Sequence, residues 1–126
     1  MRRGIQVEII DKREGGSTLS RAVGINPQSL EILKPSGVTD ELLAQGVRFE
    51  SIRIFRENRH WATLPLTAAP IRHGFNFMLG LPQDRTESIL RETFIAGGGT
   101  LIYGKELVGV RDDGKEVIVE AADGDE

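Results

Sequence analysis

The sequence predicts an α/β fold, with α+β character within this stretch of chain, from three patterns of residues. A short apolar run, residues 5–10, ends on Asp11, as expected of a largely buried strand. Two short helical segments follow, bounded by capping and stop residues. Alternating apolar and polar residues after Gly46 then predict strands, with one long helix among them. The 126 residues, 39% hydrophobic and 28% charged, suit one globular domain.

The first strand leads through a polar loop with two adjacent glycines into two predicted helices. Asn26 is a suitable N-cap, and Pro27 suits the first position of a helix that ends near Pro35. Thr39 is predicted to cap a second helix that runs to about Gln45, where a glycine follows as the stop.

The middle of the chain reads as antiparallel β-structure. Ser51–Arg56 alternates, Glu57–Asn58 suits a hairpin turn, and Trp61–Leu64 is a predicted return strand. Phe75–Leu81 also alternates, with its phenylalanines and leucines on one face. This pattern predicts a half-buried strand.

The last third is predicted as a helix and three strands. Asp84 and Glu87 have the spacing of a capping box, which would open a helix over residues 84–96. Ile89, Leu90 and Phe94 would line one face of that helix. Three glycines end it, and the strands that follow are predicted at residues 100–103, 107–111 and 116–121, with a hairpin at residues 112–114 between the last two.

Composition excludes several classes of function. The net charge is −3 and the basic residues form no stripe, which argues against nucleic-acid binding. The chain has no cysteine, so disulfides and thiolate sites are excluded, and its two histidines, His60 and His73, are too few for a catalytic metal cluster. No apolar run is long enough to span a membrane, and acids interrupt the stretch after the basic start, so we expect a cytoplasmic protein.

Three side chains are candidates for binding a ligand. A carboxylate such as Asp11 at the end of a central strand can accept two hydrogen bonds from a ribose diol, or it can be an ordinary strand-ending acid. Arg21 precedes a helix and could bind a phosphate, or it could be a solvated loop arginine. Gln83 lies at a predicted strand-to-helix corner, where it is either a ligand contact or a capping or surface residue. No spacing of nucleophile and base identifies a catalytic residue.

The Gly-rich turn that should precede Asp11 by roughly 20 residues in a dinucleotide-binding βαβ unit is absent from this sequence. Asp11 is therefore predicted to be one half of a cofactor site.

Four segments in order, RGIQVEIIDK, SRAVGINPQSLEIL, SGV and LGLPQDRTESILRETF, resemble the flavin-dependent aromatic-ring monooxygenases of the para-hydroxybenzoate hydroxylase type. The resemblance covers nearly the whole chain. It implies that Asp11 binds the adenosine ribose of FAD, with Lys12 a weaker candidate near the adenosine. It places Arg21 near the pyrophosphate and Gln83 on the ribityl–phosphate part of FAD.

The resemblance also implies the organisation of the chain: an incomplete FAD-binding, Rossmann-like half and an antiparallel substrate-side sheet. Residues 1–48 and 82–126 would form the nucleotide-binding side, and residues 49–81 the substrate side. We expect an internal fragment that lacks the GxGxxG loop and the C-terminal half of the family's domain, and that binds FAD weakly or not at all by itself.

The implied chemistry is hydroxylation of a small aromatic substrate with FAD, NAD(P)H and O2. Three alternatives stay open: a non-catalytic association module of the same ancestry, a related FAD-dependent epoxidase or reductase, and an independent α+β domain. Because an unpaired apolar strand edge favours pairing with another chain, we also expect self-association through exposed strand edges.

Overall fold

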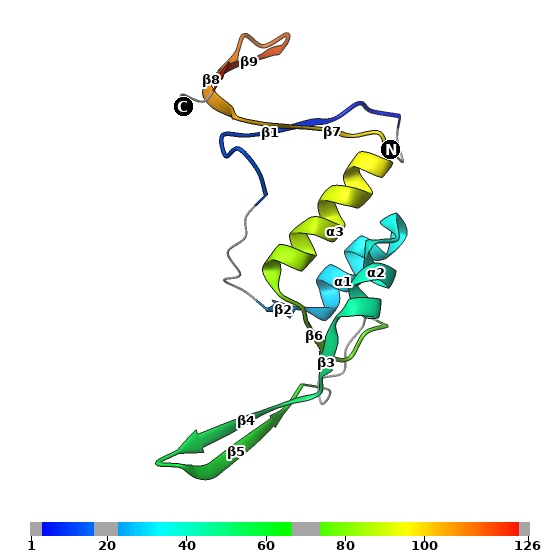
Figure 1. The fold of residues 1–126 in the computed structure, drawn as a ribbon, viewed down its shortest axis with the longest axis vertical. Helices are drawn as coiled ribbons and strands as arrows, with labels where there is room; N and C mark the ends of the chain where they lie inside the picture. Colours follow the sequence, from blue (N-terminus) through cyan, green and yellow to red (C-terminus); the bar gives the residue numbers. More distant parts are fainter. Residues whose placement is uncertain (1–3, 17–22, 67–73, 124–126) are drawn as a thin grey trace. The chain divides into compact units, whose positions relative to one another are not determined.

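The structure is a computed structural model that describes residues 4–16, 23–66 and 74–123. The chain divides into two compact units, of which unit 1 is Met1–Thr18 with Leu90–Glu126 and unit 2 is Leu19–Ile89. Both contain β-structure, and the helices lie between the strands along the chain (Figure 1). The mixed α/β prediction is therefore confirmed. The predicted division into a nucleotide-binding side and a substrate side remains a prediction.

Unit 1 is built on a parallel pair of strands from opposite ends of the sequence. Strand β1 (Glu8–Asp11) pairs with β7 (Thr100–Tyr103), and the register places Asp11 opposite Tyr103. Parallel strands need a long crossover connection, and the whole of unit 2 lies within this one along the chain. Both strands therefore present their carboxyl ends at the same edge of the sheet.

Strand β1 differs from its prediction in length and in burial. It begins at Glu8 instead of Ile5, and the side chains of Ile5 and Ile9 are 61% and 45% exposed. The prediction of a largely buried strand is thus wrong for this part of the chain. The reason is that β1 and β7 form a sheet of two strands among the described residues, which gives their side chains few neighbours.

The remaining strands of unit 1 form the predicted hairpin, β8 (Lys105–Asp112) with β9 (Val117–Asp123). Its turn contains Gly114 at φ +81°, a conformation that glycine adopts without steric cost. The carboxylate of Asp113 accepts hydrogen bonds from the backbone N–H groups of Lys115 and Glu116, which closes the turn.

In unit 2 the predicted first helix is present as α1 (Pro27–Leu33). The Oδ1 atom of Asn26 accepts a hydrogen bond of 2.8 Å from the backbone N–H of Ser29, which confirms Asn26 as the N-cap. Pro35 does not stop the chain from turning further, because it lies in a short 3₁₀ helix, η1 (Lys34–Ser36). Proline is tolerated in a first helical turn, where its missing N–H is not needed.

The second helix, α2 (Val38–Gln45), ends before Gly46 as predicted, but it begins differently. Its N-cap is Gly37, at φ +83°, and Thr39 lies inside the helix. The Thr39 side chain is fully buried, and its hydroxyl donates a 2.5 Å hydrogen bond to the carbonyl of Leu30. The capping role predicted for Thr39 is therefore wrong, because this hydroxyl joins α2 to α1.

Antiparallel strands make up the rest of unit 2. Strand β6 (Met78–Gly80) lies between β2 (Gly24–Ile25) and β3 (Val47–Phe49) in a three-stranded sheet. Strands β4 (Ser51–Arg56) and β5 (Arg59–Pro65) form the predicted hairpin. Strand β6 is shorter than the predicted Phe75–Leu81 because its partners are only two and three residues long.

The turn of the β4–β5 hairpin confirms its prediction. Glu57 and Asn58 both have positive φ, 49° and 59°, as a type I′ turn requires. This turn carries the right-handed twist of the two strands it connects.

The hydrophobic core of the described residues lies in unit 2, where α1, α2, β6 with its flanking residues and the first half of the last helix supply it. The predicted alternation around β6 is confirmed, since three of the four predicted inward residues are buried. The buried apolar residues are Leu30, Val38, Leu42, Phe77, Leu79, Leu81 and Ile89.

Helix α3 (Gln83–Ala96) runs across the boundary between the two units. It begins one residue before Asp84, so Asp84 lies in the first turn and the predicted capping box is wrong. Within the helix, Ile89 is buried while Leu90 is 37% exposed, because adjacent residues point about 100° apart and one narrow face meets the core. Gly98, at φ +84°, follows its end, as the three glycines predict.

Candidate functional site

The sequence-predicted site residues fall into different parts of the structure. Asp11 and Lys12 belong to unit 1, and Gln83 belongs to unit 2. Arg21 lies outside the described residues. The binding roles of all four remain predictions.

Asp11 is the last residue of β1, at the edge where both parallel strands end. In open α/β sheets the ligand binds outside the carboxyl ends of the strands, so this is the position that a cofactor-binding acid occupies. The Asp11 side chain keeps 26% of its surface exposed, which leaves it accessible.

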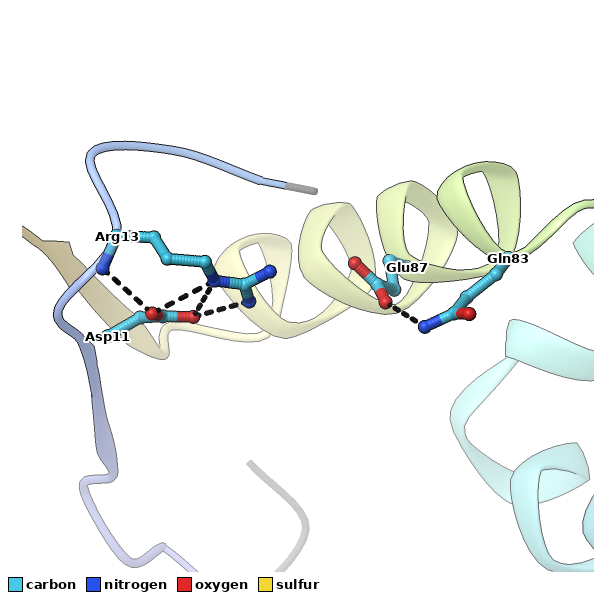
Figure 2. Close-up of polar contacts among 4 residues, drawn as sticks. All are labelled: Asp11, Arg13, Gln83 and Glu87. Carbon is cyan, nitrogen blue, oxygen red and sulfur yellow. Dashed lines mark hydrogen bonds and ion pairs between the residues drawn. The ribbon is translucent and has the colours of Figure 1, made fainter. Parts of the chain in front are cut away.

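The carboxylate of Asp11 is held by a residue that the sequence reasoning missed (Figure 2). Arg13 donates to it from Nη2 at 2.6 Å and from Nε at 3.1 Å to each oxygen, while its backbone N–H donates to Oδ1 at 3.0 Å. A guanidinium placed two residues after a strand-ending acid is the signal that could have predicted this contact.

These contacts lower the pKa of Asp11. The hydrogen bonds from the Arg13 side chain and then from its backbone N–H hold the pKa at about 2, below the ordinary 3.8, and the charges of Arg13 and Lys12 act in the same direction. The carboxylate is therefore ionised at neutral pH, in the form that accepts hydrogen bonds from hydroxyl groups.

Replacing Arg13 with glutamine is expected to raise the pKa of Asp11 toward 3.8. Because the pKa of Asp11 in the folded protein lies below its ordinary value, the ionised carboxylate stabilises the folded state above about pH 3.8. This stabilisation is lost as the pH falls toward 2. A carboxyl-detected NMR titration from pH 5 to pH 1.5 measures this shift.

Asp113 is the internal control for that titration. Backbone N–H groups of Glu116 and Lys115 lower its pKa, and Arg13 takes no part in those bonds. An unchanged midpoint for Asp11 in the Arg13→Gln protein would contradict the assignment of the shift to the guanidinium.

Lys12 points its ammonium group to Glu106 of β8, at 3.1 Å. Both side chains are largely exposed, so the ion pair contributes little to stability. It ties the residue after Asp11 to the β8–β9 hairpin.

Gln83 stands at the strand-to-helix corner that the sequence predicts. The chain leaves β6 through Leu81, whose backbone N–H donates to the carbonyl of Val23, and α3 begins two residues later. The amide Nε2 of Gln83 donates a 2.7 Å hydrogen bond to Oε1 of Glu87 (Figure 2). The side chain is partly buried.

A small cavity of about 120 Å³ lies beside this corner. Its lining is mostly apolar, and Gln83 supplies the one amide side chain. The volume is below the range of roughly 300–1,000 Å³ that holds a whole small molecule, so the cavity suits one part of a larger ligand. Its lining residues are Val23, Gly24, Ile25, Leu81, Gln83 and Thr86.

Each of these two places, taken by itself, suits polar groups of an organic ligand better than it suits a metal. An ionised carboxylate at a sheet edge suits a diol, and an amide beside an apolar cavity suits a ligand with hydroxyl groups next to a ring. Within the described ranges, no three histidine, aspartate or glutamate side chains are grouped to bind a metal ion. In the same part of the chain no helix has the length and apolar character needed to cross a membrane.

Comparison with known proteins identifies the family. The family described as "FAD binding domain" matches residues 1–126. A rifampicin monooxygenase of Rhodococcus hoagii is 33% identical over 121 residues, which are 96% of this chain and 24% of that protein. The 6-methylpretetramide 4-monooxygenase of Streptomyces rimosus is 35% identical over 113 residues, 84% of this chain and 19% of that protein. The chain thus spans about a fifth to a quarter of the length of these curated relatives.

Solved structures agree with the sequence relatives. An aklavinone-11 hydroxylase, solved as a ternary complex with FAD and aklavinone, superposes with a TM-score of 0.78 at 28% identity, over 96% of this chain and 26% of the other. A p-nitrophenol 4-monooxygenase from Pseudomonas putida DLL-E4 shares the fold, with a TM-score of 0.84 at 17% identity over 95% of this chain and 31% of the other. The chain belongs to the FAD-binding-domain family of the flavin-dependent aromatic monooxygenases, as its four sequence segments indicate.

Proposed function

We propose that this chain supplies two contact points for FAD, one for the adenosine half and one for the flavin half, within a monooxygenase that hydroxylates an aromatic substrate. The observation that carries the proposal is the ionised carboxylate of Asp11 at the shared end of two parallel strands. The Gln83 amide beside the apolar cavity supports it independently.

In this proposal each side chain has a distinct role. Asp11 accepts hydrogen bonds from the adenosine ribose, with Lys12 beside it, and Gln83 contacts the ribityl–phosphate chain. By family resemblance, Arg21 would bind near the pyrophosphate. The bound FAD supplies the redox chemistry, and these residues bind and orient it.

The substrate class follows from the relatives. Their names refer to rifampicin, 6-methylpretetramide and aklavinone, so we propose an aromatic substrate for the protein to which this chain belongs. The antiparallel strands within residues 49–81 would border its pocket. NAD(P)H as co-substrate and a cytoplasmic location belong to the same proposal.

A second function, association with another chain, is favoured by one observation. Apolar side chains of β1 and of the residues before it are exposed, Ile5 at 61% and Ile9 at 45%. Such a strand can pair with an added strand from another chain. In that case the chain would work by association, without binding a nucleotide.

Fragments of FAD distinguish these functions, because each tests one half of the proposed contacts. In an NMR titration of the ¹⁵N-labelled chain, ADP is expected to shift the amide signals around Asp11, and FMN those of Gln83 and Gly24. Binding of each fragment is expected in the millimolar range, since each can make only part of the contacts proposed for FAD, and Kd values near 1 mM correspond to about −4 kcal/mol.

Matched variants and ligands sharpen the result. Asp11→Ala should abolish the signal shifts caused by ADP and keep those caused by FMN. Gln83→Ala should abolish the shifts caused by FMN and keep those caused by ADP. The 2′,3′-dideoxy form of ADP, which lacks the ribose diol, should shift the signals near Asp11 much less. Equal shifts with ADP and its dideoxy form would contradict the ribose contact. NMR line widths that increase with protein concentration and do not change on addition of ADP or FMN would favour association.

A further inference from the structure

Among the described residues, the donors to the Asp11 carboxylate all belong to one residue, Arg13. Its backbone N–H and its Nε and Nη2 atoms make two contacts with each carboxylate oxygen, at 2.6–3.1 Å (Figure 2). An ionised carboxylate has about four acceptor positions, and a ribose diol needs two of them. The contacts from Arg13 therefore occupy positions that the diol would need.

The contacts from Arg13 differ in how firmly the structure holds them. The backbone carbonyl of Arg13 accepts a 3.0 Å hydrogen bond from the N–H of Gly104, which lies between β7 and β8, so the backbone beside Asp11 is anchored. The Arg13 side chain is 54% exposed, and ion pairs in exposed positions are weak. The guanidinium is thus the donor that a ligand can displace, while the backbone N–H stays in place.

We propose that the Arg13 guanidinium competes with the ribose diol for Asp11, so that the diol binds as the guanidinium leaves the carboxylate. The inference rests on the proposed function, because it takes the adenosine ribose to be the ligand of Asp11. Two hydroxyl groups would replace the two guanidinium donors, which keeps the carboxylate fully hydrogen-bonded. Because the competition is for the acceptor oxygens of Asp11, it does not depend on what else the Arg13 side chain contacts.

Three variants of the full chain test the competition at neutral pH, where the Asp11 carboxylate is ionised with or without the guanidinium. Arg13→Met removes the side-chain donors and keeps the backbone N–H. Arg13→Lys keeps the charge but loses the planar fork that reaches both carboxylate oxygens. Arg111→Gln is the matched control, since it removes an equal charge from an exposed position on β8 in the same unit.

The first readout is the NMR signal of the Arg13 Nε–H group in the wild-type chain. As ADP approaches saturation, this signal should move toward the position of a free arginine, because the diol takes the oxygens that Nε contacts. The 2′,3′-dideoxy form of ADP carries the same phosphate groups without the diol. It should leave the signal in place.

The second readout is the preference for the diol, measured as the Kd of dideoxy-ADP divided by the Kd of ADP. The two ligands have equal charge, so the loss of a cation weakens the binding of both and cancels in the ratio. In Arg13→Met the ratio should rise about two- to fivefold, as expected for the removal of an exposed ion pair. It should rise less in Arg13→Lys and stay at the wild-type value in Arg111→Gln.

Two results would overturn the competition alone. One is an unmoved Arg13 Nε–H signal while ADP, but not its dideoxy form, shifts the Asp11 amide signal. The other is the same ratio, well above one, in wild type and Arg13→Met. A ratio near one in both chains would overturn the proposed ribose contact as well. A signal that moves with ADP only, or a diol preference that appears only in Arg13→Met, would support the competition.

Discussion

Replacing Leu79 with alanine is expected to lower the unfolding free energy of unit 2 by about 2–5 kcal/mol. The Leu79 side chain is fully buried, and its strand is the centre of the three-stranded sheet. Removing its methyl groups loses their transfer free energy and leaves a cavity that the two flanking strands cannot close. Urea denaturation followed by far-UV circular dichroism measures the loss, since most of the helical residues lie in unit 2.

Two further variants test the mechanism. Leu107→Ala makes the same chemical change on β8, where the side chain is 52% exposed, and should cost much less. Leu79→Met conserves volume and should cost less than about 1.5 kcal/mol. Equal destabilisation by the alanine variants at positions 79 and 107 would contradict the placement of the core.

Replacing Gly46 with alanine is expected to destabilise unit 2 by about 1–3 kcal/mol through overpacking. A Cβ atom at this position would lie 2.7 Å and 2.8 Å from side-chain carbons of Leu79 and 2.9 Å from the carbonyl oxygen of Leu42. That oxygen accepts the Gly46 N–H at the end of α2 and cannot move without disturbing the helix. The same urea experiment measures the effect.

Gly15→Ala is the matched control for this change. Among the described residues, no atom outside its chain neighbours lies within 4 Å of a Cβ built at Gly15, and its φ lies outside the left-handed region. The substitution should leave stability within about 0.5 kcal/mol or raise it slightly by restricting the unfolded chain. A Gly46→Ala chain as stable as Gly15→Ala would contradict the close approach of β6 to the end of α2.

Features set by neighbours in the sequence could be predicted. The Asn26–Pro27 start of α1 depends on side-chain-to-backbone bonds within four residues, and the Glu57–Asn58 turn depends on its two central residues. Both are confirmed. The end of α3 before three glycines is of the same kind.

Features set by tertiary contacts could not be predicted in the same way. Thr39 has the chemistry of a cap, but its hydroxyl donates to a carbonyl nine residues away in another helix. The length of β6 depends on strands that are distant in the sequence. Glu87 was predicted to join Asp84 in a cap, whereas it accepts from Gln83.

The candidate site shows the same division. The strand-end position of Asp11 and the corner position of Gln83 follow from strand and helix boundaries, which local patterns indicate. Arg13, which donates to Asp11, and Glu87, which accepts from Gln83, are two and four residues away from them. The sequence spacing permits these hydrogen bonds, but it does not predict that they form in preference to other hydrogen bonds of the same side chains.

The parallel pairing of β1 with β7 joins residues about ninety positions apart, with the whole of unit 2 between them. For a flexible chain of that length, loop closure costs about 4 kcal/mol of entropy by the (3/2)RT ln n relation. Four residue pairs in a two-stranded sheet can offset little of that cost. Folding of unit 2 shortens the loop that must be closed, so we expect the pairing that holds Asp11 at its sheet edge to depend on the hydrophobic core of unit 2.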